Sequence, residues 1–226
     1  MTKRPEIIPA ILPKDFAEVQ EKIDLIKDFV KTVQIDVCDG QFVPSATWPY
    51  RKEDDSFEKI VKEEEGLPGW EKLNFEIDLM ANKPEEKVEQ WVQAGATRII
   101  IHIEARGNIE GAIDILKDRI EIAVALNIDT PVSAIEPFKD KIQGIQLMGI
   151  DTIGFQHQPF DTKVIDKVKE VRAAYPDMSI SVDGGVSLEN GSALIEAGAD
   201  RLVVGSAIFE SDNYVDAVTN FKKLGH

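Results

Sequence analysis

The chain has 226 residues, 43% of them hydrophobic and 30% charged, so it is long enough to bury a substantial core. Asp and Glu number 41 against 26 Lys and Arg, which gives a net charge of −15. Such an acidic surface repels nucleic acid and anionic lipid, so we expect neither as a partner. No apolar run approaches the roughly 20 residues that span a bilayer, and we see no signal-peptide pattern. A single cysteine, Cys38, excludes an intrachain disulfide, and we expect a cytoplasmic globular protein.

Short apolar runs rich in β-branched residues alternate with longer segments of helical period. Eight such runs at about 28 residues per unit match a (β/α)8 TIM barrel, an α/β fold, and we predict one barrel domain over residues 1–226. A doubly wound open sheet is the alternative. The predicted strands are 6–12, 32–38, 73–80, 97–104, 121–127, 151–156, 179–185 and 201–207. The amphipathic segments between them include 15–29, 83–95, 161–176 and 213–224.

An internal repeat favours the barrel. The segment 93–101 (QAGATRIII) is echoed by 196–204 (EAGADRLVV), and 147–153 is a weaker copy between them. Each copy has the pattern of a helix end, a glycine stop, a short turn and a new strand. The spacing of about two βα units is what a rotationally repeating barrel produces.

The segment at about 50–71 breaks this rhythm. It is an acidic insertion in the second βα unit, and its charge pattern predicts a solvated helix with a loop. Trp48, Tyr50 and Trp70 are dense in and beside it, so a lid or a subunit contact, and with it a homo-oligomer, is the other interpretation.

Polar side chains interrupt several apolar strands near their carboxyl ends, where barrels of this kind place their reactive groups. The second predicted strand carries Gln34 and Asp36 on one face, and the third carries Asp78 and Met80. Carboxylates are costly in a barrel interior unless each is paired, protonated or metal-bound, so we expect them to form a site. The remaining predicted strand ends contribute His102 and Glu104, Gln156 and His157, and Asp183.

Two glycine-containing strand ends predict a phosphate site. Gly184 and Gly185 follow the seventh predicted strand, and Gly205 and Ser206 lie at the end of the eighth. Glycine lets backbone N–H groups approach an anion closely, and the loops after strands seven and eight form a recurrent phosphate site in barrels. On a chain of charge −15, local amides rather than the overall field must hold an anion.

The run 35–44, IDVCDGQFVP, resembles the signature of the ribulose-phosphate 3-epimerase family. Its resemblance implies two aspartates on opposite sides of a ketopentose phosphate. One removes the C3 proton, the other returns a proton to the opposite face, and a metal ion stabilises the enediolate. Asp36 and Asp183 stand at these two positions. Further collinear matches lie at 8–16, 78–80, 102–105, 182–186 and 198–207.

The chain departs from the family pattern at the metal site. Gln34 and Asp78 stand where the family has metal-binding histidines, and Ala10 and Cys38 replace a serine and a methionine. The family's glycine-rich loop after strand six is shortened here. The expected ligands all offer oxygen, which suits magnesium or manganese better than zinc. These ligands are Gln34, Asp36, Asp78 and Asp183.

We also expect His102 to orient a substrate hydroxyl or a neighbouring carboxylate, and His157 to contact the phosphate or the sugar. The resulting hypothesis is a ribulose-phosphate 3-epimerase-like isomerase that inverts C3 of a phosphorylated ketose. Two alternatives stay open: another phosphosugar isomerase or lyase on the same barrel, and a catalytically silent phosphosugar-binding protein.

Overall fold

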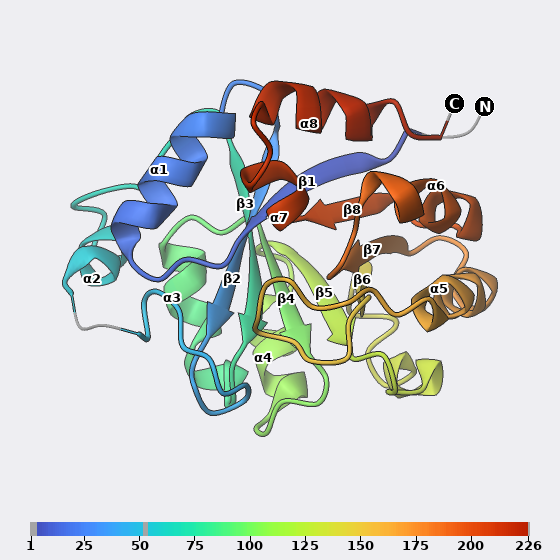
Figure 1. The fold of residues 1–226 in the computed structure, drawn as a ribbon. Helices are drawn as coiled ribbons and strands as arrows, with labels where there is room; N and C mark the ends of the chain where they lie inside the picture. Colours follow the sequence, from blue (N-terminus) through green and yellow to red (C-terminus); the bar gives the residue numbers. More distant parts are fainter. Residues whose placement is uncertain (1–3, 52–53, 226) are drawn as a thin grey trace.

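Eight parallel strands close into a barrel in chain order, with β1 paired to both β2 and β8 (Figure 1). The structure is a computed structural model that describes residues 4–51 and 54–225. Closure between the first and last strands confirms the predicted (β/α)8 barrel and excludes the open sheet. The strands are β1 Glu6–Ile11, β2 Thr32–Cys38, β3 Asn74–Met80, β4 Arg98–His102, β5 Glu121–Leu126, β6 Gly144–Met148, β7 Ser179–Asp183 and β8 Arg201–Val204.

Helices cover the outside of the barrel (Figure 1). Two of these helices show common terminal caps: at the start of α1, Asp15 Oδ1 accepts a hydrogen bond from Glu18 N at 3.0 Å, and Gly198 ends α6 with φ of 118°. Within the described residues, no helix has the length and apolar character to cross a bilayer. The helices are α1 Phe16–Ile26, α2 Ser56–Val61, α3 Val88–Gln93, α4 Ile109–Leu116, α5 Lys163–Ala174, α6 Leu188–Ala197, α7 Ser206–Phe209 and α8 Tyr214–Lys222, with 3-10 turns at Pro84–Glu86 and Val132–Ile135.

The predicted sixth strand is wrong. The strand lies at Gly144–Met148, every residue of which is buried, and it pairs with β5 and β7. Residues 151–156 belong instead to the loop between β6 and α5, where Gly154 adopts a φ of +84° against Val43. The weaker repeat copy at 147–153 fails for the same reason, because it starts at the end of a strand rather than at the end of a helix.

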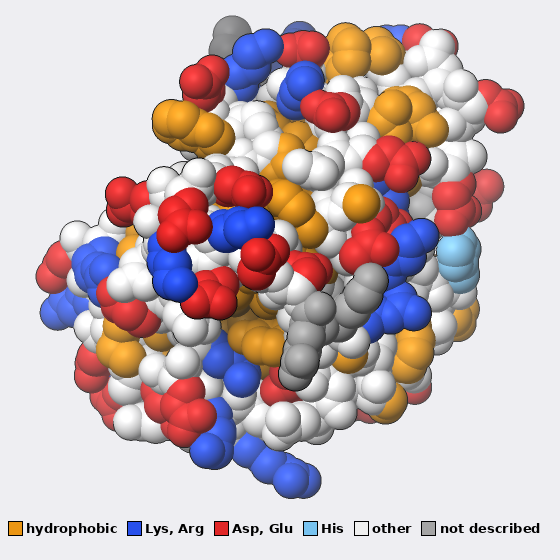
Figure 2. Space-filling view, turned by 90° about the vertical axis from the view of Figure 1, so that its left-hand side faces the viewer, with side chains coloured by type: hydrophobic (Ala, Val, Ile, Leu, Met, Phe, Trp, Pro, Cys, Tyr) orange, Lys and Arg blue, Asp and Glu red, His pale blue; other side chains and the backbone are white. Residues whose placement is uncertain are grey.

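The segment at 50–71 contains the predicted solvated helix. On α2, Lys59 pairs with Asp55 at 2.9 Å and Lys62 with Glu58 at 2.5 Å. Figure 2, viewed from the side of α1 and α2, shows acidic and basic side chains interspersed over this face. Trp48 is buried and lies edge-on to the rings of Phe57 and Trp91, whereas Trp70 is 65% exposed. The aromatic residues therefore divide between anchoring this segment and facing solvent.

The barrel interior is polar at both ends. The outward faces of the strands pack apolar side chains against the helices in one large core. Among the described residues, three small apolar clusters lie inside the barrel or at its carboxyl end. The inward-facing polar side chains include Gln34, Glu76, Asp78, His102, Gln146 and Asp183, all buried. Ionic and amide groups in such a setting need partners close by.

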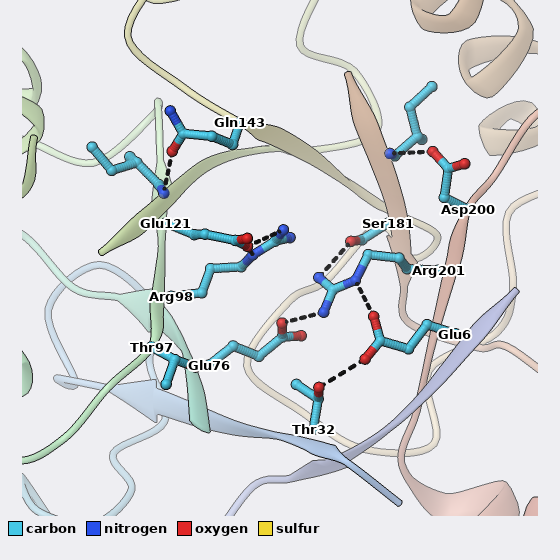
Figure 3. Close-up of polar contacts among 12 residues, drawn as sticks. Glu6, Thr32, Glu76, Thr97, Arg98, Glu121, Gln143, Ser181, Asp200 and Arg201 are labelled. Atoms are coloured by element: carbon cyan, nitrogen blue, oxygen red, sulfur yellow. Dashed lines mark hydrogen bonds and ion pairs between the residues drawn. The ribbon is translucent and has the colours of Figure 1, made fainter. Parts of the chain in front are cut away.

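The two strong copies of the repeat supply an ionic floor at the amino-terminal end of the strands (Figure 3). They place Arg98 first on β4 and Arg201 first on β8, four strands apart in a barrel of eight. Arg201 contacts the fully buried Glu76 at 2.7 Å and Glu6 at 3.0 Å. Arg98 pairs with Glu121 at 2.6 Å. The floor thus neutralises a carboxylate in the barrel interior and joins β8 to β1 and β3.

Arg201→Met should destabilise the fold by about 3–5 kcal/mol, because it leaves Glu76 as an unpaired buried charge. Arg119→Met removes an exposed pair with Glu89 and should cost less than about 1 kcal/mol, which makes it the matched control. Denaturant unfolding measures both variants. The double variant Glu76→Leu/Arg201→Met should recover most of the stability lost in Arg201→Met. Equal losses of stability in Arg201→Met and Arg119→Met would contradict this role of the Arg201–Glu76 pair.

Candidate active site

A cavity of about 480 Å³ opens at the carboxyl ends of the strands. Carboxylates from three strands, Asp36 of β2, Asp78 of β3 and Asp183 of β7, lie in its base. Its wall includes Met80 and His157, and its rim is formed by residues that follow β7 and β8. The expected phosphate-site residues Gly184, Gly185, Gly205 and Ser206 all line it. The structure therefore brings almost all the predicted site residues into one cavity.

The three carboxyl groups are close enough to repel one another. One oxygen from each of Asp36, Asp78 and Asp183 lies within 4.8 Å of the others. Burial, and then the charges of Asp183 and Asp78, raise the pKa of Asp36 well above its ordinary value. Burial and the charge of Asp78 raise the pKa of Asp183 to about 7. In the metal-free protein the cluster therefore retains at least part of a proton at neutral pH, which suits a group that acts as an acid.

Two buried glutamines donate hydrogen bonds to the carboxyl groups of Asp36 and Asp183. Gln34 Nε2 donates to Asp36 Oδ1 at 2.7 Å and to Asp183 Oδ2 at 2.6 Å. Gln146 Nε2 donates to the same Asp183 oxygen at 3.2 Å. Sequence reasoning missed Gln146 because the sixth strand was placed too late. Its signal was a polar residue in a short apolar run, two positions before Met148.

His102 lies behind the cavity rather than on its wall. It is fully buried at the end of β4, and its Nε2 lies 3.0 Å from Asp78 Oδ1. Burial alone would lower the pKa of His102, but the adjacent charges of Asp78 and Glu104 raise it above the ordinary value. Of the two expected roles, its position corresponds to orienting a carboxylate.

His157 stands in the loop after β6, on the exposed side of the cavity. Its Nε2 lies 2.5 Å from Glu210 Oε1, so the pair joins this loop to the segment after α7. His157 has a φ of 60°, which is uncommon for a residue other than glycine. Both residues line the cavity.

The donor set of the carboxylate cluster fits a hard divalent cation. Asp78 Oδ2 and Gln34 Oε1 are buried and have no hydrogen-bond partner among the described residues. Both are oxygen atoms, as are the three convergent carboxylate donors, and no nitrogen or sulfur ligand belongs to this group. The residues present therefore could bind a divalent metal ion.

Glycine is required at two of the phosphate-site positions for backbone reasons. Gly184 and Gly185 have φ of +98° and +67°, and a Cβ on either would lie within 3.0 Å of Ile150 or Phe160. Gly205 differs, because a Cβ there would meet only the Ala10 carbonyl oxygen, at 3.5 Å. Its missing side chain keeps the cavity open and leaves the backbone accessible.

Comparisons with known proteins identify the family of this chain. The model of the ribulose-phosphate 3 epimerase family matches residues 6–209. The chain is 32% identical to ribulose-phosphate 3-epimerase of Bacillus subtilis (strain 168), over 96% of this chain and 98% of the relative. It is 30% identical to the enzyme of the same name from Schizosaccharomyces pombe, over 96% of this chain and 92% of the relative.

Among solved structures, 3-hexulose-6-phosphate synthase from Salmonella typhimurium superposes with a TM-score of 0.70 at 14% identity. The match covers 96% of this chain and 97% of that one. At this identity the similarity concerns the fold alone.

The raised pKa of Asp183 predicts a pH-dependent effect on stability. The folded state binds this proton more tightly than the unfolded state, so the unfolding free energy of the metal-free protein should fall as pH rises from about 4 to about 7. Asp183→Asn removes this dependence. Its stabilising effect should be small at pH 4 and reach on the order of 2–4 kcal/mol at pH 8.

Chemical denaturation with a chelator present, repeated across this pH range, measures the effect. Asp24→Asn, on the exposed face of α1, is the control and should change stability by less than about 0.5 kcal/mol at each pH. A benefit of Asp183→Asn that is the same at pH 4 and pH 8 would rule out the ionisation of Asp183 as its source.

Proposed function

This chain belongs to the ribulose-phosphate 3-epimerase family, and we propose that it inverts C3 of a ketose phosphate with Asp36 and Asp183 as acid and base. The family places it among the isomerases. The relatives are named for ribulose phosphate, so a pentulose phosphate is the proposed substrate class. The alternatives, another phosphosugar enzyme or a silent binding protein, would be distinguished by the tests below.

The observation that carries this proposal is the composition of the cavity. The paired aspartates lie at its base, and the glycine-containing ends of β7 and β8 lie at its rim. A phosphate held at the rim by backbone N–H groups would direct the rest of a short sugar chain toward the carboxylates. Asp36 and Asp183 come from β2 and β7, so two different walls present them.

The chemistry needs one ionised and one protonated carboxyl group. The ionised group takes the proton from C3, and the bond's electron pair moves into an enediolate with the neighbouring carbonyl. The protonated group then delivers its proton to the other face of C3, so the product is the epimer and the two groups have exchanged states. Gln34 and Gln146 hold Asp36 Oδ1 and Asp183 Oδ2, and the other oxygen of each accepts no hydrogen bond from a described residue.

Asp36, Asp78 and Asp183, with Gln34 beside them, would hold a divalent ion, magnesium or manganese in preference to zinc. Such an ion supplies charge that stabilises an enediolate oxygen.

Asp36→Asn and Asp183→Asn should each lower kcat by about 10²- to 10⁴-fold, because an amide can neither accept nor return the proton. A coupled assay with ribulose 5-phosphate measures kcat, and calorimetry measures substrate binding, which should fall far less. If the native protein epimerises no pentulose or hexulose phosphate, the epimerase proposal is wrong and the silent binding protein becomes the better account.

Gly205→Val should weaken binding of phosphorylated sugar and leave the fold intact. Gly205 lines the cavity, and a Cβ at this position would make only an ordinary contact, 3.5 Å from the Ala10 carbonyl oxygen. Calorimetric titration with ribulose 5-phosphate and with unphosphorylated ribulose measures this. The native protein should prefer the phosphorylated sugar, and the variant should lose that preference. Equal affinity of the native protein for both sugars would contradict a phosphate site.

A further inference from the structure

Gln146 is a polar side chain where the barrel would accept an apolar one. It is fully buried in the middle of β6, and the neighbouring strand β5 fills its interior positions with Ala123 and Ala125. Its Nε2 donates to Asp183 Oδ2, whereas its Oε1 is buried with no partner among the described residues. A buried amide oxygen without a partner costs stability, and a methionine of similar length would avoid that cost. The stability of the fold therefore does not explain this glutamine.

A second donor matters because Gln34 alone does not fix the carboxyl group of Asp183. The two N–H bonds of the Gln34 amide are divided between Asp36 and Asp183, which leaves one for each. A carboxyl group held by one hydrogen bond can still rotate about its Cβ–Cγ bond. Gln146 approaches from β6, the strand beside β7, and binds the same oxygen that Gln34 binds from β2. Two donors from different strands fix Oδ2 and so orient Oδ1.

We propose that Gln146 is a positioning residue for proton transfer by Asp183: it fixes the carboxyl group so that Oδ1 faces C3 of the substrate. This inference rests on the proposed function and adds to it a residue that touches neither substrate nor phosphate. Asp36, the other acid–base group, has no such second donor: among the described residues its carboxyl group accepts a hydrogen bond only from the Gln34 amide. Loss of Gln146 should therefore impair one of the two proton transfers and spare the other.

The test replaces Gln146 with methionine, and Gln143→Met is the matched control. Gln143 Oε1 accepts a hydrogen bond from Ile122 N at the floor of the barrel, away from the cavity. Gln146→Met should lower kcat roughly 10- to 100-fold, the loss expected for a misplaced reacting group, with little change in KM. Its thermal midpoint should stay level or rise. Gln143→Met should show the reverse pattern, a lower midpoint with native kcat.

Deuterium exchange at C3 in heavy water then tests which proton transfer is affected. When Asp36 removes the proton from the starting epimer, protonation of the enediolate by Asp183 should be slower in the variant. More of the enediolate should then return to the starting epimer, carrying deuterium, for each molecule converted. When Asp183 must remove the first proton, the variant should be slow without this extra exchange. Comparing the native protein and Gln146→Met from both epimers by NMR reveals the asymmetry.

Native kcat in Gln146→Met, or equal extra exchange from both epimers, would overturn the positioning role. A lower thermal midpoint combined with an equal loss of activity from both epimers would identify Gln146 as a structural residue. Gln146→Leu repeats the test with a second apolar side chain. Failure of the proposed function is distinct, because then the native protein itself would neither epimerise the sugar phosphate nor exchange C3 hydrogen.

Discussion

Asp36, Asp78 and Asp183 share one small volume of the barrel interior, and the neighbouring side chains reduce the electrostatic cost of placing three carboxyl groups there. Burial and mutual repulsion disfavour full ionisation, which is why the pKa values of Asp36 and Asp183 rise. Hydrogen bonds from Gln34, Gln146 and His102 reduce this electrostatic cost, and a cation bound between the three carboxyl groups would reduce it further. The mutual repulsion that lowers the stability of the fold also leaves a carboxyl group able to exchange a proton near neutral pH. The cost in stability and the proposed chemistry therefore have one origin.

At the opposite, amino-terminal end of the barrel, a buried carboxylate is instead neutralised by a permanent charge. Glu76 is as deeply buried as Asp78, two residues further along β3, yet it pairs with Arg201. Guanidinium groups remain charged at any physiological pH, so the floor is fixed, whereas the carboxyl end relies on groups that titrate. The division agrees with the general behaviour of these barrels, in which the amino-terminal face contributes stability and the carboxyl-terminal face contributes chemistry.

Much of this arrangement follows from the sequence because parallel strands obey simple rules. Same-face spacing placed Gln34 with Asp36 and Asp78 with Met80, and the order of strands then determined that Asp183 would meet them. The prediction of the sixth strand failed because the segment 151–156 (DTIGFQ) has strand-like composition. The true strand, Gly144–Met148, has only five residues and begins with glycine. The sequence could not predict which carboxyl group each side chain would contact. That Gln146 would bind Asp183, and that the carboxyl group beside His102 would be that of Asp78, depends on rotamers and on barrel geometry.

The most direct test of this account is the titration of the carboxyl group of Asp183 in the metal-free native protein. With carbon-13 in the aspartate side chains, NMR follows its carboxyl carbon against pH, and Asp183→Asn assigns the signal. We predict a midpoint displaced upward to about 7, coupled to a second transition from Asp36. A midpoint near the ordinary aspartate value of about 4 would show that the cluster carries its full charge, and would contradict the account.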